Sequence, residues 1–458
     1  MDRIVVAGGS LAGLVVALFA ARSGREVVVL EGDDRPVPAA PEDVWQGWRR
    51  RGVPQFRQLH GTQALGWSIL AARAPDVLAE LGAVGACAAQ LLTLPGPVAA
   101  ELVQLRCRRP ILEWVLRRTV LAEPGIEFRP GTEVTGLRLG GRSRPRVSGV
   151  ITTSGELAAQ LVIDATGRRS RIGEWCVHAG ASAPQTRTVE TGQAYFTRWF
   201  RRSTPFTATD PMLRVELAFA TLLLCPADAD WFSATFFAPV GDRALRRLLM
   251  DSDGFRAAVA SVPSAAAWLE DARPVGTVQF MGGLANQLRH TAPDGRSPVG
   301  LLAVGDSAVC TNPTWGRGGA LAMASAAALV DAMTAFDNPS AVTRAHTVWT
   351  TQHHEPWFYD TLLLDAETNA AWAGRPPSPH LDRPFRHAAA ALVARTDAGV
   401  GVAYMRYRNL IDPPEAFWGD TEIADRVLGA TNAGATTHLN DAPLPSRQQF
   451  LALDHAVV

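Results

Sequence analysis

The chain has 458 residues, of which 47% are hydrophobic and 19% charged, a globular composition with enough length for two or three domains. Basic and acidic residues number 44 each, so the charge gives no reason to expect nucleic acid or an anionic membrane as a partner. All the basic residues are arginine, which excludes a lysine nucleophile or Schiff base. Five dispersed cysteines without a CxxC pair favour a reduced, cytoplasmic protein.

The N-terminal residues predict a parallel βαβ unit. Residues 4–6 form a β-branched run, residues 14–22 have the character of a buried helix, and residues 27–30 form a second strand. Residues 4–21 carry no charge, but the glycine cluster "GGSLAG" interrupts them. A strand, a tight turn and a buried helix explain this run better than a membrane span, so we expect none.

The remaining chain changes character twice. Residues 191–280 are aromatic and β-rich, which predicts a separate sheet, and residues 340–458 are mainly helical in pattern. Two further apolar strands, in "LVIDATG" and "LLAVGD", stop abruptly at Asp164 and Asp306. Shorter elements are predicted as a helix at residues 108–122 and strands at 126–129, 134–139 and 147–152.

The cluster "GGSLAG" fits a dinucleotide-binding turn with one departure. Gly8 permits the tight turn and Gly13 lets the helix pack on the strand, while Ser10 replaces the glycine that lies nearest the pyrophosphate. Glu31 follows at the distance expected for a carboxylate that binds a ribose 2′-OH, which favours FAD or NAD over NADP. A buried turn with no ligand is the alternative.

Two later segments strengthen this interpretation. "IDATGRRSR" and "AVGDSAVCTNPTWGRGGA" each follow an apolar strand that ends in aspartate beside glycine. Ligands of open parallel sheets bind at the carboxyl ends of the strands, where an aspartate can accept hydrogen bonds from sugar or polyol hydroxyls. The glycines after Pro313 would let backbone approach a flat ring, and the helix from Ala320 would supply N–H groups that stabilise negative charge.

The chain resembles the flavin-dependent monooxygenases of the aromatic-hydroxylase type, and within them soluble bacterial enzymes similar to squalene epoxidase. The resemblance covers most of the chain and depends on the motifs "GGSLAG", "RGVPQFRQLH", "RPILEWVLRR", "VIDATGRRSR", "VGDS…NPTWGRGGALA" and "RNLIDPPE". It implies FAD as cofactor. The residues expected to contact FAD are Gly8, Ser10, Leu11, Ala12, Gly13, Glu31, Arg109, Val134, Asp164, Gly305, Asp306, Pro313, Gly316, Gly318, Gly319 and Ala320.

The residues expected nearest the flavin ring are Pro313, Trp315, Gly316 and Gly318, and no side chain is assigned a catalytic role. The family usually has asparagine where this chain has Ala320, so that contact is backbone-only or absent. Trp315 shields the ring, contacts substrate, or packs against the neighbouring sheet.

The resemblance also implies an architecture. We expect an α/β fold with a Rossmann-like FAD-binding domain built from residues 1–75, 100–185 and 290–336. A β-rich substrate domain, residues 76–99 and 186–289, would be inserted into it, and residues 337–458 would form a helical C-terminal region.

The expected reaction is epoxidation or hydroxylation of a hydrophobic, secondary-metabolite substrate by O2, through a flavin C4a-hydroperoxide. NAD(P)H or reduced flavin from a partner reductase would supply the electrons. A FAD-dependent reductase or dehydrogenase without oxygen insertion is an alternative, and so is a FAD-free binding protein. A flavin-dependent halogenase is disfavoured, because that class uses an essential lysine and a WxWxIP motif, and this chain has neither.

Several other side chains have two readings. His60 either faces the flavin or substrate, or is structural, and Gln58 stands where related enzymes often have a second histidine. The adjacent His353, His354 and Glu355 lack helical i,i+4 spacing, so we expect no metal site. A further group of aromatic residues lines a pocket or belongs to the sheet core: Tyr195, Trp199, Phe232, Phe236 and Phe237.

Overall fold

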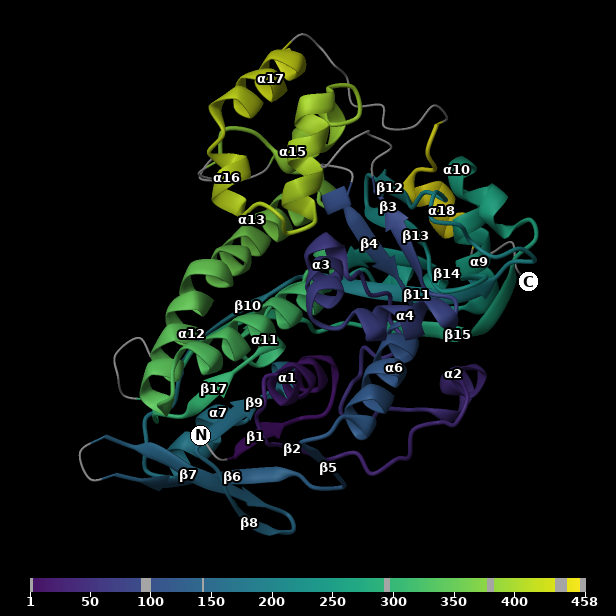
Figure 1. The fold of residues 1–458 in the computed structure, drawn as a ribbon. Coiled ribbons are helices and arrows are strands. Elements are labelled where there is room, and N and C mark those ends of the chain that lie inside the picture. Colours follow the sequence, from purple (N-terminus) through teal and green to yellow (C-terminus); the bar gives the residue numbers. More distant parts are fainter. Residues whose placement is uncertain are drawn as a thin grey trace.

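A five-stranded parallel sheet lies in the part of the molecule that contains the N-terminus (Figure 1). The computed structural model describes residues 3–91, 100–141, 144–291, 297–376, 383–432 and 443–453. The strand order is β17-β9-β1-β2-β5, with bounds β1 (Ile4–Ala7), β2 (Val27–Glu31), β5 (Ile126–Pro130), β9 (Leu161–Asp164) and β17 (Leu301–Ala303). Every residue of β17, β9, β1 and β2 is buried, as expected for a parallel sheet covered on both faces. The predicted α/β class with a parallel sheet is confirmed.

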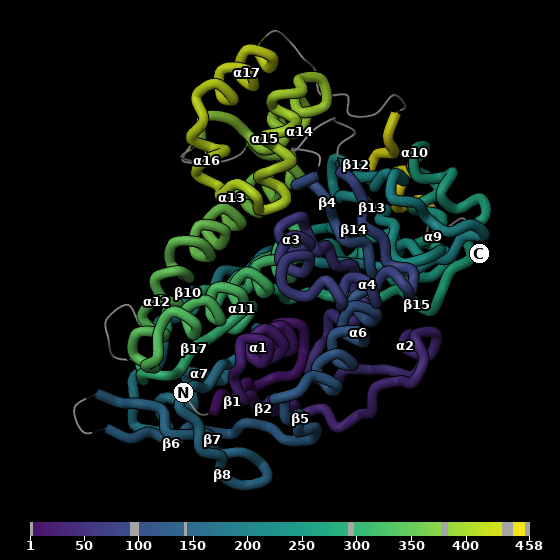
Figure 2. The backbone as a smooth tube through the Cα atoms, viewed as in Figure 1, coloured from purple at the N-terminus to yellow at the C-terminus, as the bar shows by residue number. Residues whose placement is uncertain are grey.

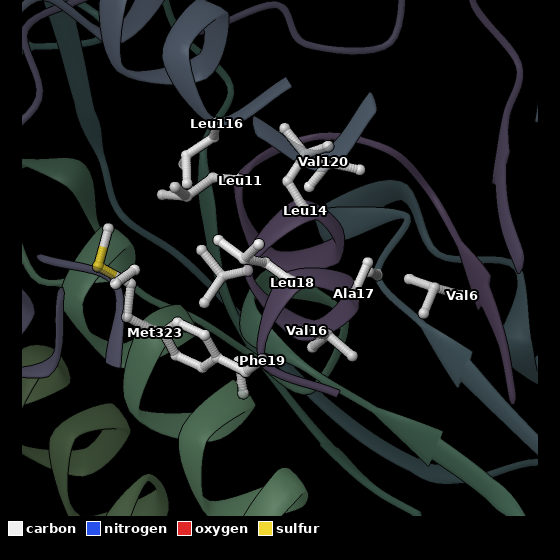
Figure 3. Close-up of a cluster of buried hydrophobic side chains, with 14 of the residues drawn as sticks. Val6, Leu11, Leu14, Val16, Ala17, Leu18, Phe19, Leu116, Val120 and Met323 are labelled. Atoms are coloured by element: carbon white, nitrogen blue, oxygen red, sulfur yellow. The ribbon is translucent and has the colours of Figure 1, made fainter. Parts of the chain in front are cut away.

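Helices cover one face of this sheet. Helix α1 (Leu11–Arg22) packs against α11 (Gly318–Ala335) and α6 (Arg109–Ala122). Figure 3 shows Leu14, Leu18 and Phe19 of α1 surrounded by side chains from β1, α6 and α11. Further helices on this side are α2 (Val44–Gly47), α3 (Gln63–Arg73) and α4 (Pro75–Ala83).

The uncharged N-terminal run is therefore a strand, a turn and a core helix. Within the described part of the chain, α11 is the one helix long and apolar enough to span a membrane, and 61% of that stretch is buried. It contacts α1, α3 and α12 (Pro339–His353), so its apolar character is explained by packing in the core.

The other face of the parallel sheet carries a three-stranded antiparallel sheet and a short helix. Val5, Val28 and Val162 point to this side and pack against Leu137 and Val150. The elements are β6 (Val134–Gly140), β7 (Arg146–Thr152), β8 (Gly155–Ala158) and α7 (Ile172–His178).

The β-rich part contains a five-stranded antiparallel sheet, a three-stranded sheet and a strand pair. The large sheet has the order β12-β13-β14-β11-β15, with bounds β11 (Gln193–Arg201), β12 (Leu213–Leu217), β13 (Ala220–Pro226), β14 (Trp231–Pro239) and β15 (Arg273–Met281). One face packs on α8 (Arg243–Met250), α9 (Ser252–Ala260) and α10 (Pro263–Ala266). The smaller sheets are β10 (Gln185–Glu190) with β16 (Ala285–His290) and β18 (Val309–Cys310), and β3 (Cys87–Gln90) with β4 (Val103–Arg106). The predicted boundary between residues 99 and 100 cuts through this last pair.

The C-terminal part is helical, as predicted, but its last helix returns to the β-rich part (Figure 1). Phe450 of α18 (Arg447–Ala452) is fully buried, with its ring 5.2 Å from Phe219 and 5.6 Å from Phe236. Figure 2 shows α13 leading from α12 to the group of later helices. These helices are α13 (Glu355–Trp372), α14 (His387–Val393), α15 (Ala398–Arg408), α16 (Pro414–Trp418) and α17 (Thr421–Asn432).

A buried ion pair joins these helices to the segment "NPTWGRGGA". Nη1 of Arg317, a residue with no exposed surface, lies 2.6 Å from Oδ2 of Asp360 on α13. The same carboxylate accepts hydrogen bonds from the Tyr407 hydroxyl and the Trp418 indole, each at 2.8 Å, and pairs with Arg383. Arg317 therefore points away from the parallel sheet, into the C-terminal helices.

We expect Asp360→Asn to lower the free energy of unfolding by about 3–5 kcal/mol, because it leaves two buried guanidinium groups without a counter-charge. Chemical denaturation measures the effect. Glu422→Gln, which breaks an exposed pair with Arg426, is the matched control and should cost less than about 1 kcal/mol. Equal losses of unfolding free energy in the two variants would contradict the large stabilising contribution expected of the buried pair.

Candidate functional site

A cavity of about 160 Å³ lies at the carboxyl edge of the parallel sheet, and we call it the sheet-edge cavity. The N-terminal residues of two helices border it, at Ser10 to Ala12 of the α1 turn and Gly316 to Gly319 before and within α11. The loops after β9 and β17 supply Thr166 to Arg169 and Asp306. The structure thus brings together the three motifs that the sequence placed at strand ends.

Backbone packing requires the first and last glycines of "GGSLAG". Gly8 has φ +103°, and a Cβ there would lie 2.6 Å from the Ala165 carbonyl oxygen. A Cβ on Gly13 would lie 1.8 Å from the carbonyl oxygen of Gly8. These distances allow no side chain, so both glycines act through close approach of backbone segments. Gly305, with φ +57°, similarly lets the loop after β17 pass close to Ala12.

Positive charge gathers at the α1 end of the sheet-edge cavity. Arg109 and Arg168 line it beside the α1 N-terminus, whose backbone N–H groups favour an anion. Arg109 donates to the Ser10 hydroxyl at 3.0 Å and to the buried Glu113 carboxylate at 3.0 Å, which fixes the position of its guanidinium. This end suits a phosphate or diphosphate group.

Asp306 contributes a carboxylate further along the same cavity. Burial raises its pKa, while Arg109, Arg168 and Arg289 act in the opposite direction. A carboxylate in this setting is a good acceptor for hydroxyl groups of a ligand.

The segment "NPTWGRGGA" forms another part of the wall, with Gly318 next to Asp306. Gly316 adopts φ +67° after the short helix Pro313–Trp315, and α11 then begins at Gly318. A Cβ on Gly318 or Gly319 would make only ordinary contacts at 3.5 Å, so protein packing does not require glycine at either position. Their missing side chains instead keep the cavity open, as a ligand ring lying against backbone would need.

Some predicted ligand contacts do not line this cavity. The Glu31 carboxylate accepts from the Gly9 backbone N–H at 2.9 Å and pairs with Arg50 at 2.6 Å. The Asp164 carboxylate is fully buried and accepts from the Thr166 backbone and hydroxyl at 2.9 and 2.6 Å, so it holds the turn after β9. Val134 and Ala320 are buried in the protein core, at 4% and 0% exposure.

A second cavity, of about 240 Å³, adjoins the first, and we call it the aromatic cavity. Tyr195, Trp199 and Phe237 line it from one face of the large antiparallel sheet, whereas Phe232 and Phe236 belong to the core on the other face. Side chains alternate between the two faces along β11 and β14, which separates the two groups. The first three residues therefore line a pocket and the other two belong to the sheet core, so each of the two predictions is correct for part of the set. The residues common to the walls of both cavities are Gln58, Leu59, His60, Gly61, Met281, Pro313 and Gly316.

His60 lies on this shared wall, a position that sequence reasoning left undecided. Its Nδ1 is 3.0 Å from the Gln58 carbonyl oxygen, so we assign the proton to Nδ1, which leaves Nε2 as an acceptor. Burial and the nearby Arg109 lower the pKa of His60 to about 3. The imidazole is therefore neutral in the physiological range.

Trp315 lines the aromatic cavity and not the sheet-edge cavity. Its indole N–H donates at 3.0 Å to Asp365 on α13, and that carboxylate also accepts from Asn286 and Asn312 at 2.8 and 2.7 Å. Burial raises the pKa of Asp365 to about 6, against the lowering effect of these donors.

No metal centre is found among the described residues. They contain no group of three or more His, Cys, Asp or Glu side chains that could hold an ion. His354 is buried beside Trp349, with ring centroids 4.7 Å apart. Cys310, beside Asp306, has a thiol whose pKa burial raises well above its usual value, so it is a neutral lining residue and not a thiolate.

Comparison with known proteins identifies the fold. No family model matches the chain. Protein Rv3254 of Mycobacterium tuberculosis is 29% identical over 357 residues, which cover 69% of this chain and 70% of that protein. A triple mutant of the flavin-dependent brominase Bmp2 superposes with a TM-score of 0.62 at 12% identity, over 95% of this chain and 100% of the brominase. PqsL from Pseudomonas aeruginosa, described as a probable FAD-dependent monooxygenase, gives 0.57 at 16% identity, over 82% and 98%. The chain has the fold shared by these flavoenzymes.

Asp365 should make stability depend on pH. Its folded-state pKa of about 6 exceeds the ordinary value of 3.8, so its contribution to stability is present at low pH and is lost as pH rises through about 6. Relative to Asp365→Asn, the wild type should gain about 2 kcal/mol between pH 7.5 and 4.5. Denaturation curves at several pH values measure this difference, and a constant difference would contradict the raised pKa.

Proposed function

We propose that this chain is a FAD-dependent monooxygenase that oxidises an apolar substrate held in the aromatic cavity. The observation that carries the proposal is the wall that the two cavities share, which includes His60, Pro313 and Gly316. It provides one place where a redox-active ring and a substrate can meet. The likeness of fold to a brominase and a monooxygenase that use flavin supports the same cofactor here.

The lining of the sheet-edge cavity fits part of FAD well. Arg109, Arg168 and the α1 N-terminus would hold the diphosphate, and Asp306 would accept a hydrogen bond from a ribityl hydroxyl. The backbone from Pro313 to Gly319 would lie along the ring. At the adenosine end, the carboxylate of Glu31 is already paired with Arg50.

When bound and reduced, FAD supplies the chemistry that activates O2 and transfers one oxygen atom. The chain's own residues set the conditions for that chemistry. The aromatic cavity, walled by Trp199, Phe237 and Met281, keeps water from the reacting atoms. Nε2 of His60 offers a hydrogen-bond acceptor at the shared wall, and the α11 N-terminus stabilises negative charge. NAD(P)H or a partner flavin reductase would provide the electrons.

The reaction type is tested with purified protein, FAD, a reductant and a library of apolar substrates under isotope-labelled O2. We expect a product that carries one labelled oxygen atom. A product without the label would indicate a reductase or dehydrogenase and refute oxygen insertion. Bromide and chloride are included in parallel, since a halogenated product would instead favour the chemistry of the brominase.

The cofactor site is tested with Asp306→Ala. Loss of a charged hydrogen-bond acceptor should weaken FAD binding about tenfold or more, measured by titration with flavin fluorescence. Asp331→Ala removes an exposed carboxylate of α11 that pairs with Arg73, and it serves as the control. Unchanged FAD affinity in Asp306→Ala would refute its assigned role.

A further inference from the structure

We infer that the substrate carries an anionic group, and that Arg408 and Arg214 bind it at one end of the aromatic cavity. The inference rests on the proposed function, since it names the class of molecule that the aromatic cavity receives. It begins from charge. Three arginines, Arg106, Arg214 and Arg408, line this cavity, and no aspartate or glutamate among the described residues does.

Arg408 is the last residue of α15 and the first of the motif "RNLIDPPE", which the cofactor site leaves unexplained. Its guanidinium lies over the Trp315 ring, with Cζ 5.1 Å from the ring centroid. It makes no hydrogen bond or ion pair with a described residue, and its Nη1 is buried without a partner. Arg408 is half-buried, and the enclosed part of its guanidinium lacks the counter-charge that buried charged groups ordinarily have.

The neighbouring residue fixes Arg408 in this position. The Asn409 side chain accepts from the backbone N–H of Ala64, in the first turn of α3, at 3.3 Å and donates to the Met405 carbonyl at 3.0 Å. The end of α15 is thereby held against α3, and Met405, Arg408 and Asn409 line the aromatic cavity there. The Arg408 side chain is therefore placed at the cavity by a specific backbone contact.

Arg214 approaches the same indole from strand β12. Its Cζ lies 5.9 Å from the Trp315 centroid and 6.0 Å from that of Phe237. Its ion pair with Glu216, at 2.6 Å, uses Nε, which leaves the two Nη groups available for a further partner. Two cationic groups thus flank Trp315 within one cavity.

The acidic groups near Trp315 do not pair with Arg408, because Asp365 accepts from the Trp315 indole and Glu216 pairs with Arg214. His387 lies 5.1 Å from the indole, and its ring is 3.0 Å from the Tyr404 hydroxyl. Burial, then Arg408 and Arg214, hold the pKa of His387 well below its usual value, so this ring is neutral. Arg214 already pairs with Glu216, so an anion from outside the protein is needed to pair with Arg408.

The same geometry specifies the rest of the ligand. The planar guanidinium fork matches a carboxylate or a similar delocalised anion, and the walls of Trp199, Phe237 and Trp315 suit flat apolar rings. Trp315 is followed directly by Gly316 of the shared wall. An anion held at Arg408 would therefore direct its ring system toward the reaction position. The ligand class is an aromatic or polycyclic acid.

The test compares acids with their neutral amides in FAD-free protein. Benzoate, 2-naphthoate and anthracene-2-carboxylate are each titrated beside the corresponding carboxamide, with quenching of tryptophan fluorescence as the readout. We expect at least one acid to bind about tenfold or more tightly than its amide, because an ion-paired hydrogen bond is lost in the amide. No preference for any acid would overturn the inference.

Variants locate the preference. Arg408→Leu should remove it and Arg408→Lys should keep part of it, while Arg426→Leu, an exposed arginine of α17, should leave it unchanged. If Arg408→Leu fails to fold, Arg214→Leu takes its place. A preference that survives in both leucine variants would overturn the assignment.

A failure of this inference can be distinguished from a failure of the proposed function, because FAD affinity is measured on the same variants. We expect that affinity not to change. Retained acid binding with no FAD binding would refute the proposed function alone. Retained FAD binding with no acid preference would refute the inference alone.

Discussion

The buried pair between Arg317 and Asp360 sets the relation between the parts of this molecule. Arg317 is the only charged side chain in the segment that borders both cavities, and it is directed wholly toward the C-terminal helices. The backbone on either side of it is thereby left to face the cavities, with glycine at positions 316, 318 and 319. Asp365, five residues beyond Asp360, holds the Trp315 indole from the same helix. Helix α13 thus positions the segment at two successive points.

The features that the sequence predicted correctly depend on local backbone geometry. Gly8 and Gly13 have no room for a side chain, and the apolar runs that end at Asp164 and Asp306 are strands of the parallel sheet or lead directly from one. The structure at such positions can be predicted from the sequence because the backbone conformation there restricts which residue types fit. The α/β class and the helical C-terminal part could be predicted from hydrophobic periodicity, which is also a property of local sequence.

What the sequence could not show depends on contacts between distant segments. Glu31 lies at the spacing from the glycine cluster expected of a carboxylate that binds a ribose, but Arg50, from a separate loop, pairs with it. Asp164 has the right neighbours, yet nearby hydroxyl groups satisfy its carboxylate. His60 and Arg408 gain their places at the cavities only through tertiary packing, and α18 joins a core assembled from residues far earlier in the chain. No local pattern encodes these pairings.

The position of Phe450 has a consequence for the order of assembly during synthesis. The core of the β-rich part is otherwise built from strands and helices between β11 and β15, which leave the ribosome long before α18 does. Until then, Phe219 and Phe236 lack the ring that covers them. During synthesis, the sheet that forms one side of the aromatic cavity therefore cannot complete its packing before α18 has emerged, by which point every strand of the parallel sheet has been made.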